Sequence, residues 1–404
     1  MLTKNLLDIG KKYLMNTYNY FPIVIDRGEG CYLWDADGKK YLDFVAGIAV
    51  NSLGYANKDY IANLTAQLNK FSHCSNLYYN APQIELAKTL VTHSCFDKVF
   101  FCNSGAEAVE AALKLARKYG KKAHSDECYE IISMKNSFHG RTFGAISATG
   151  QEKYQKGLKP LLQGIKFAEF NNIDSVKELI SDKTCAVIVE PIQGEGGIKP
   201  ANKEFLQELR KICTEKDIVL IYDEVQCGIG RTGYLFAYEY FGVQPDIIAL
   251  AKGLGGGFPI GAMLAVAKIA NAFEPGSHAS TFGGNPMAST AGLCVLDNLI
   301  NKNLLENVKT QGEYLNKKLY ETYEQVDYVK QIRGIGLMQG MELDAPAADI
   351  IKNCMDKGLL LIGAGLDVIR FVPPLIVGKN EIDEAFNILY EAMREDDEIK
   401  SQNR

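Results

Sequence analysis

Ile218-Val-Leu-Ile-Tyr-Asp223-Glu224 and Asp246-Ile-Ile-Ala-Leu-Ala-Lys252-Gly253 are two apolar runs of similar length, and each leads to a charged residue. A short, wholly apolar run of this kind is typical of a buried parallel strand. In an open α/β sheet, the carboxyl ends of the strands form the crevice where ligands bind. The sequence therefore predicts that the carboxylate of Asp223 and the amine of Lys252, 29 residues further along, reach one crevice.

An amine and a carboxylate in one crevice suit pyridoxal phosphate (PLP). A lysine can hold its aldehyde as a Schiff base, and an aspartate can keep its pyridine nitrogen protonated. Each residue also has an ordinary interpretation, because acids are common after strands and most lysines are solvated. Two features favour the cofactor. The run before Asp223 leaves its carboxylate half-desolvated and in need of a cation. The run Gly253-Leu-Gly-Gly-Gly257 after Lys252 lets backbone approach a ligand and lacks the spacing of a dinucleotide site.

The stretch Asn103-Ser-Gly-Ala-Glu107 follows an apolar run and opens a strongly helical segment. A Ser-Gly turn at a helix N-terminus offers free backbone N–H groups and the positive end of the helix dipole, which suit a phosphate. The alternative is an ordinary capping box, with Ser104 as the cap and Glu107 three residues later. The two interpretations are compatible, and both stay open.

Other polar groups follow expected strands. Phe138-His-Gly-Arg-Thr142 offers a ring that could stack on a flat cofactor and an arginine that could fork onto a substrate carboxylate. The alternative is a core phenylalanine and a surface arginine. Glu190-Pro-Ile-Gln-Gly-Glu195 ends a strand with acids and a glycine bend, and Arg370 lies in an apolar strand, where a charge indicates a partner or a ligand.

Composition excludes several classes of protein. The 404 residues are 47% hydrophobic, enough for a large core, and the net charge of −5 comes with no basic run for nucleic acid or a membrane surface. No window approaches the roughly 18 apolar residues of a membrane span. Ten scattered cysteines without a Cys-x-x-Cys pair predict reduced thiols and a cytoplasmic protein. Five histidines, none paired at ligand spacing, make a metal site unexpected.

The middle of the chain alternates strand and helix, which predicts an α/β fold with a mostly parallel, doubly wound sheet. The expected strands are Lys98–Cys102, Tyr129–Met134, Ala186–Glu190, Ile218–Asp223, Ile247–Ala251 and Ala262–Val266. After about residue 290, a long amphipathic helix over Ala291–Tyr323 is expected to begin a smaller α+β domain. We therefore expect residues 1–50 to pack with the small domain, residues 51–290 to form a large cofactor-binding domain, and residues 291–404 to form the small domain.

With these residues in place, the chain resembles the class III (ω-amino-acid) aminotransferases of PLP fold type I. The likeness runs from about Tyr18 to Ala392, and the co-linear set is more specific for the class than for the substrate. It is carried by Arg27-Gly-Glu-Gly30, Asp43-Phe-Val-Ala-Gly47-Ile-Ala-Val-Asn51, Ser75-Asn-Leu-Tyr78, Asn103-Ser-Gly-Ala-Glu-Ala108, Glu190-Pro-Ile-Gln-Gly-Glu195, Asp223-Glu-Val-Gln226, Gly230-Arg-Thr-Gly233, Ala251-Lys-Gly-Leu-Gly-Gly-Gly257 and Ser280-Thr-Phe-Gly-Gly-Asn-Pro286.

The resemblance implies a role for each residue around the cofactor. Lys252 would bind the aldehyde and move the proton, and Asp223 would pair with the pyridine nitrogen. Gln226 would lie near the ring hydroxyl, with Val225 on one ring face and Phe138 on the other. The phosphate would be held by Ser104, Gly105 and Ala106.

The resemblance also implies how substrates and a second subunit take part. Arg141 would take the α-carboxylate of an acyl-ornithine. Arg370 would take the α-carboxylate of glutamate, and Glu195 would mask it when the other substrate is bound. Tyr18 aligns with a substrate-gating position. Thr281 would reach the cofactor phosphate of a neighbouring subunit, which implies a homodimer.

Within the family, the chain most resembles the branch that acts on N2-acetylornithine in arginine biosynthesis. That branch uses 2-oxoglutarate as acceptor and forms glutamate. The likeness to it is carried by Gly47-Ile-Ala-Val-Asn51-Ser-Leu-Gly and His73-Cys-Ser-Asn76-Leu-Tyr. Succinyl-diaminopimelate, succinylornithine, ornithine and 4-aminobutyrate stay open as substrates. An aminomutase, which would not consume 2-oxoglutarate, or a decarboxylase on the same fold also stays open. A binding protein or regulator without activity is disfavoured, because every residue that the chemistry needs is present.

Overall fold

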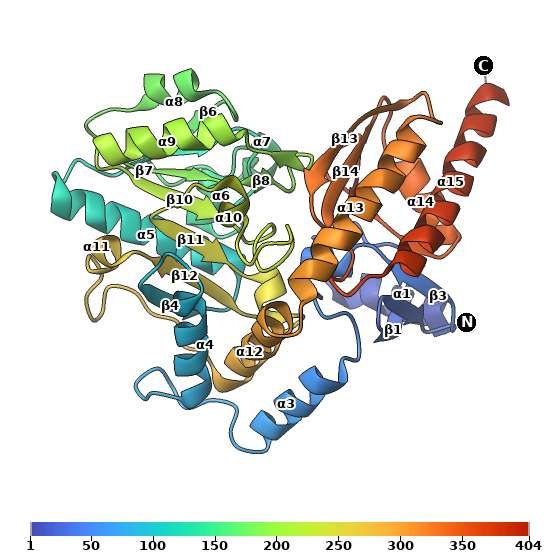
Figure 1. Cartoon of the computed structure of the whole chain (residues 1–404), viewed down its shortest axis with the longest axis horizontal. Helices are drawn as coiled ribbons and strands as arrows, with labels where there is room; N and C mark the ends of the chain where they lie inside the picture. Colours follow the sequence, from blue (N-terminus) through green and yellow to red (C-terminus); the bar gives the residue numbers. More distant parts are fainter. Residues whose placement is uncertain (1, 403–404) are drawn as a thin grey trace.

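The computed structural model describes residues 2–402 and has a large lobe and a smaller lobe (Figure 1). The large lobe is built on a seven-stranded sheet in the order β4-β12-β11-β10-β7-β5-β6. Its strands are β4 (Lys98–Cys102), β5 (Glu130–Met134), β6 (Ile165–Ala168), β7 (Thr184–Val189), β10 (Val219–Asp223), β11 (Ile247–Leu250) and β12 (Gly261–Ala265). Strand β12 alone runs in the opposite direction to the other strands of this sheet, so the predicted α/β fold with a mostly parallel sheet is confirmed.

The central strands are buried on both faces, which explains their continuous apolar sequences. In β10, Val219 and Ile221 pack with helix α5 (Gly105–Ala123), whereas Leu220 and Tyr222 pack with helix α9 (Lys203–Glu215) on the other face. Figure 1 shows these two helices on opposite sides of the sheet. The sheet therefore separates two apolar cores, and its strand ends are the places where polar groups emerge.

The smaller lobe combines both ends of the chain. Its antiparallel sheet has the order β13-β14-β17-β16, and a second sheet joins β1, β2 and β3 to β15. Because β3 (Lys40–Asp43) pairs with β15 (Leu359–Leu360), the N-terminal segment is tied to the C-terminal one. The boundaries at residues 50 and 290 stay predictions. The other strands of this lobe are β1 (Ile25–Glu29), β2 (Tyr32–Asp35), β13 (Val329–Ile335), β14 (Met338–Leu343), β16 (Ile362–Gly363) and β17 (Val368–Phe371).

The single helix predicted over Ala291–Tyr323 is wrong. The structure has α12 (Pro286–Ile300) and α13 (Leu304–Tyr323), separated at Asn303, whose φ of +56° is left-handed. Asparagine tolerates this conformation better than most residues, so the chain can turn there. Apolar periodicity does not reveal such a break, because both helices bury one face. The short edge strand β6 was also missed.

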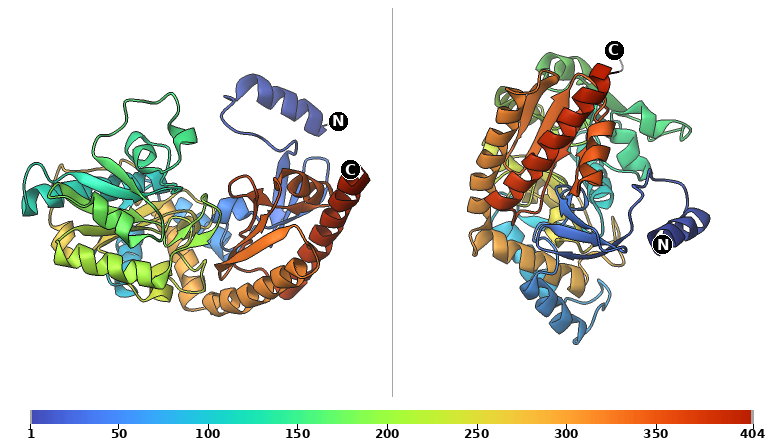
Figure 2. Two further views of the ribbon diagram at one scale, coloured as in Figure 1. Left: turned by 90° about the horizontal axis from the view of Figure 1, so that it is seen from above. Right: turned by 90° about the vertical axis from the view of Figure 1, so that its right-hand side faces the viewer.

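The remaining elements connect these layers, and helix α1 stands off the body of the molecule in both views of Figure 2. They are α1 (Leu2–Tyr13), α2 (Ala46–Ala49), α3 (Lys58–Leu68), α4 (Ala81–Thr92), α6 (Phe143–Ala148), α7 (Glu152–Gln155), α8 (Ile173–Leu179), β8 (Ile192–Gln193), β9 (Lys199–Pro200), α10 (Ala237–Phe241), η1 (Lys252–Gly255), α11 (Ala267–Ala270), α14 (Ala348–Asp356) and α15 (Lys379–Gln402). Within residues 2–402, no helix combines the length and the apolar character that a membrane crossing requires.

Candidate active site

A cavity of about 340 Å³ opens at the carboxyl ends of β10 and β11, where the crevice was predicted. This size falls within the range of small-molecule sites, roughly 300–1,000 Å³. Eight of the predicted site residues line it together: Ser104, Gly105, Ala106, Phe138, Asp223, Val225, Gln226 and Lys252. Segments far apart in the sequence therefore meet in one cavity.

Asp223 is the last residue of β10 and is only 5% exposed. Its Oδ2 accepts a hydrogen bond from Nδ1 of His139 at 2.7 Å, and its Oδ1 accepts one from the backbone N–H of Val225 at 3.0 Å. The Nε2 atom of His139 is buried and has no partner among the described residues. Sequence reasoning missed His139. The signal that could have indicated His139 was its position next to Phe138, in the stretch that was already predicted to contribute a stacking ring and an arginine to the site.

Lys252 lies two residues after the end of β11 and is in the left-handed region, with φ +46°. A non-glycine residue in this conformation is strained, and such strain is found at functional sites. Burial, reinforced by the charge of Arg370, lowers the pKa of the Lys252 amine against the opposing effect of Glu195. A larger fraction of the amine is therefore neutral at a given pH, which is the form that attacks an aldehyde.

The N-terminus of α5 points into the cavity and supports both interpretations of the Ser-Gly turn. Ser104 caps the helix, because its Oγ accepts a hydrogen bond from the N–H of Glu107 at 3.2 Å. The first turn is also packed closely against Val225. A Cβ atom on Gly105 would lie 2.6 Å from Val225 Cγ1. The missing side chain of Gly105 thus lets Val225 pack against the first turn of α5, beside the backbone N–H groups that a phosphate would approach.

Glu190 joins two loops of the site. Its Oε2 accepts a hydrogen bond from the N–H of Phe138 at 3.0 Å, and its Oε1 accepts one from the N–H of Gly194 at 3.2 Å. Burial, followed by the nearby charge of Asp223, raises the pKa of Glu190 well above its usual range. Glu190 therefore holds Phe138 in the same framework as the loop that ends in Glu195.

Arg370 and Glu195 form an ion pair beside the cavity, with Nη1 2.5 Å from Oε1. Arg370 is 1% exposed and also donates to Oε1 of Gln226 at 3.0 Å and to the carbonyl of Gly363 at 3.1 Å. Burial raises the pKa of Glu195, but the adjacent Arg370 outweighs it, and the net pKa lies below its usual value. The charge expected in this apolar strand therefore has a partner.

The three other predicted residues lie outside the cavity. Arg141 is exposed, and its guanidinium lies 4.0 Å from the ring centroid of Tyr154, which contacts Phe138 edge-on. Thr281 and Tyr18 are exposed and do not line the cavity. Their predicted functions require either a substrate or a second subunit.

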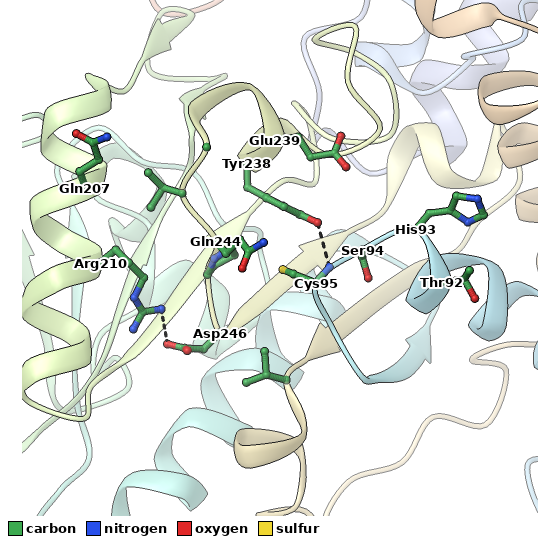
Figure 3. A pocket seen from close by; sticks show the side chains of 14 residues that line it. Thr92, His93, Ser94, Cys95, Gln207, Arg210, Tyr238, Glu239, Gln244 and Asp246 are labelled. Atoms are coloured by element: carbon green, nitrogen blue, oxygen red, sulfur yellow. Dashed lines mark hydrogen bonds and ion pairs between the residues drawn. The ribbon is translucent and has the colours of Figure 1, made fainter.

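A larger cavity of about 880 Å³ lies at the opposite edge of the sheet, where Asp246 precedes β11 (Figure 3). Its charged groups already have partners. Arg210 pairs with Asp246 at 2.9 Å, and the N–H of Phe236 donates to Glu239 at 3.2 Å. None of the residues predicted for the active site lines it, so its larger size does not make it the catalytic site. In residues 2–402, no group of acidic, histidine and cysteine side chains is arranged to hold a metal ion.

Comparison with known proteins agrees with this geometry. Residues 13–393 match the class-III aminotransferase family. An acetylornithine aminotransferase of Caldanaerobacter subterraneus is 53% identical over 95% of this chain and 98% of its own length. One from Methanocaldococcus jannaschii is 48% identical over 98% and 99%.

Solved structures show the same fold. An ornithine aminotransferase of Toxoplasma gondii has a TM-score of 0.94 at 30% identity, over 98% of this chain and 96% of that one. Another structure of that enzyme is described as having partial occupancy of PLP at its active site. An N-acetylornithine aminotransferase of Stenotrophomonas maltophilia has a TM-score of 0.83 at 36% identity, over 96% and 98%.

A lysine, an acid and a helix N-terminus converge here at the strand ends of an α/β sheet, as a PLP-dependent transaminase requires. The chain belongs to the class-III aminotransferases, and PLP is its cofactor.

The contact between Gly105 and Val225 yields a test of the cofactor cavity. In Gly105→Ala, the new Cβ must displace either Val225 or the first turn of α5, and both line the cavity. Overpacking costs about 1–3 kcal/mol, so the dissociation constant for PLP should rise by about 5- to 150-fold. Fluorescence titration of the apoprotein measures it. Val225→Ala should partly restore affinity in the double variant, and unchanged affinity in Gly105→Ala would contradict the placement of the cofactor.

Proposed function

We propose that this transaminase moves the ω-amino group of N2-acetylornithine to 2-oxoglutarate and forms N-acetylglutamate 5-semialdehyde and glutamate, a step of arginine biosynthesis. The observation that carries an ω-amine reaction is the ion pair of Arg370 with Glu195 beside the cavity. The relatives described as acetylornithine aminotransferases favour this ω-amine among the others.

A panel of ω-amines with 2-oxoglutarate as acceptor tests the substrate. We expect the highest kcat/KM for N2-acetylornithine. A higher value for succinyl-diaminopimelate, succinylornithine, ornithine or 4-aminobutyrate would contradict this substrate while keeping the class. Turnover without consumption of 2-oxoglutarate would indicate an aminomutase or a decarboxylase instead.

Lys252 is proposed to be the catalytic base. When bound, PLP supplies an aldehyde that takes up the amino group and a ring that accepts the electrons left by a departing proton. Lys252 holds this group through its amine and then removes the proton from the substrate carbon that bears the amino group. The lowered pKa of Lys252 favours the neutral amine that this step needs. Aligned proton transfer is worth roughly 10²–10⁴-fold in rate.

Asp223 is proposed to hold a proton at the pyridine nitrogen. Its Oδ2 is oriented by Nδ1 of His139, so the carboxylate is fixed before the cofactor arrives. Phe138 and Val225 line the cavity and are proposed to pack against the ring, and Gln226 is proposed to lie near its hydroxyl group. The remaining group, the phosphate, is assigned to the backbone N–H groups of Ser104, Gly105 and Ala106.

The two substrates place opposite demands on Arg370. In N2-acetylornithine the reacting amine is far from the α-carboxylate, whereas in glutamate it is adjacent. A free Arg370 would attract the α-carboxylate of acetylornithine and present the wrong end of the molecule. Pairing with Glu195 neutralises it at low cost, because one partly desolvated ion pair replaces another. We propose that glutamate displaces Glu195, while Arg141 binds the remote carboxylate of either substrate.

A homodimer is proposed because the loop that carries Thr281 lies beside an exposed apolar surface. Asn76 donates hydrogen bonds to the carbonyls of Ser280 and Gly283, so two loops form one surface. On it, Leu77, Tyr79 and Phe282 are 87%, 92% and 58% exposed. A cluster of large apolar side chains in water favours burial by another protein. Thr281 would then reach the neighbouring phosphate.

Two further expectations concern the location of the protein and the role of Tyr18. All ten cysteines are free, which agrees with a reducing compartment and the proposed cytoplasmic location. Tyr18 lies in an exposed segment with its ring 5.8 Å from that of Tyr20, and its gating role stays a prediction.

Lys252→Ala should remove nearly all turnover and leave the fold intact, because it deletes the base without disturbing the packed sheet. We expect a fall of at least about 10²-fold, together with loss of the borohydride-sensitive visible absorbance band of the wild-type protein. Near wild-type transamination by this variant would rule out Lys252 as the base.

Mixing two variants tests whether Thr281 acts across the dimer. A hybrid of one Lys252→Ala subunit and one Thr281→Ala subunit would contain one site with both lesions and one with neither. The purified hybrid should therefore have about half of the wild-type rate, since one site of two is intact. If Thr281 acted within its own subunit, the hybrid would not exceed half of the rate of the Thr281→Ala homodimer. An active monomer in sedimentation would exclude the proposal outright.

Three variants should separate the roles of the arginines. Arg370→Ala should damage the glutamate half-reaction far more than the acetylornithine half-reaction, whereas Arg141→Ala should damage both. Losing a buried charged contact costs about 2–5 kcal/mol, which corresponds to about 30-fold or more in rate. Glu195→Ala should leave glutamate turnover intact and weaken selectivity for the ω-amine. Single-turnover rates of each half-reaction measure this, and equal losses for Arg370→Ala would disprove the switch.

A further inference from the structure

Arg231 is a buried cation between the two lobes and has no acidic partner in the described part of the chain. It is 2% exposed, and its Nη1 donates to the carbonyls of Leu337 at 3.0 Å and Pro373 at 2.5 Å. Its Nη2 is buried without a partner, and burial lowers its pKa to about 9. Burying an uncompensated charge is unfavourable, so the stability of the fold does not explain this residue.

The two sides joined by Arg231 are the two sides of the active site. On one side, Arg231 lies in the loop that follows Asp223 at the end of β10, and this loop also carries Gln226. On the other side, Pro373 follows β17, the strand that carries Arg370. Beside the cavity, Arg370 donates a hydrogen bond to Gln226, which lines it, at 3.0 Å. The loop after β10 and the segment of β17 are therefore connected twice. One connection is Gln226 with Arg370, beside the cavity, and the other is Arg231 with Pro373, away from the cavity.

The rear connection has little room to move. The N–H of Leu337 donates back to the carbonyl of Arg231 at 3.0 Å. Gly336 has a φ of +57°, and a Cβ there would lie 2.6 Å from the carbonyl carbon of Thr232. A Cβ on Gly312 would lie 2.7 Å from Gly336. Backbone contact prevents the lobes from coming closer here, and the guanidinium of Arg231 holds them from moving apart.

We propose that Arg231 is a positioning residue that fixes Arg370 relative to the cofactor cavity and thereby sets the affinity for substrates with the carboxylate next to the reacting carbon. These substrates are glutamate and 2-oxoglutarate, and the inference rests on the proposed role of Arg370. N2-acetylornithine reacts with Arg370 masked by Glu195, so its affinity does not depend on this distance.

Arg231→Met tests the proposal, because methionine is an apolar side chain of roughly similar shape that fills much of the same space and removes the buried charge. The melting temperature of the apoprotein should be unchanged or higher. The KM values for glutamate and 2-oxoglutarate and the dissociation constant for glutarate should rise by about 5- to 30-fold, while the KM for N2-acetylornithine stays within about twofold. Arg231→Lys, which can reach one of the two carbonyls, should recover part of the affinity.

Thr232→Val is the matched control. Its hydroxyl is buried next to Arg231 and has no hydrogen-bond partner among the described residues, so its removal should leave both KM values unchanged. Equal rises in KM for glutamate and acetylornithine, or a lower melting temperature with an unchanged KM ratio, would overturn the proposal. If Arg231→Met does not fold, Arg231→Lys replaces it. A ratio of the KM for glutamate to the KM for acetylornithine that is unchanged in Arg231→Lys would then overturn the proposal, and a raised ratio would support it.

The Arg370→Ala background separates this inference from the proposed function. Adding Arg231→Met there should not weaken glutamate binding further, because both changes act through one side chain. If Arg370→Ala itself spares the glutamate half-reaction, the proposed switch is wrong and the positioning role fails with it. If Arg370→Ala is damaging but Arg231→Met leaves the KM ratio unchanged, only the inference about Arg231 is wrong.

Discussion

The parallel pairing of β10 with β11 is the constraint on which the rest of the site depends. Asp223 pairs with Ala249, so the chain that leaves β11 carries Lys252 out at the same edge of the sheet. Both strands are buried on both faces, and a shift by one residue would exchange the side chains between the two cores. The hydrophobic core therefore specifies the register, and the register specifies the distance between the acid and the base.

Around Asp223 and Lys252, each buried acidic side chain has a defined hydrogen-bond or ion-pair partner. Asp223 is held by His139, Glu190 by two backbone N–H groups, and Glu195 by Arg370. Such partners fix each carboxylate before any ligand binds, since an unpaired buried acid is costly. Lys252 is the exception. Its side-chain amine makes no hydrogen bond within residues 2–402, and burial lowers its pKa.

The site is also shared between the lobes. Strand β17, which carries Arg370, belongs to the small lobe, whereas Asp223, Lys252 and the N-terminus of α5 belong to the large one. If Arg370 binds a substrate carboxylate as proposed, the contacts of Gln226 and Arg231 across the junction make the separation of the two lobes part of substrate recognition. In that case, residues distant from the reacting atoms would affect one half-reaction and spare the other.

The sequence by itself determined the elements that carry the chemistry. Unbroken apolar runs before Asp223 and Lys252 can be satisfied only by burial on both faces, and the Ser-Gly turn before a helical segment marks a helix N-terminus. Tertiary structure alone decided which side chains touch. His139 reaches Asp223 across 84 residues, and Arg370 reaches Gln226 across 144. Local periodicity reports which face of a segment is buried, but distances between remote side chains depend on how whole layers and lobes pack together.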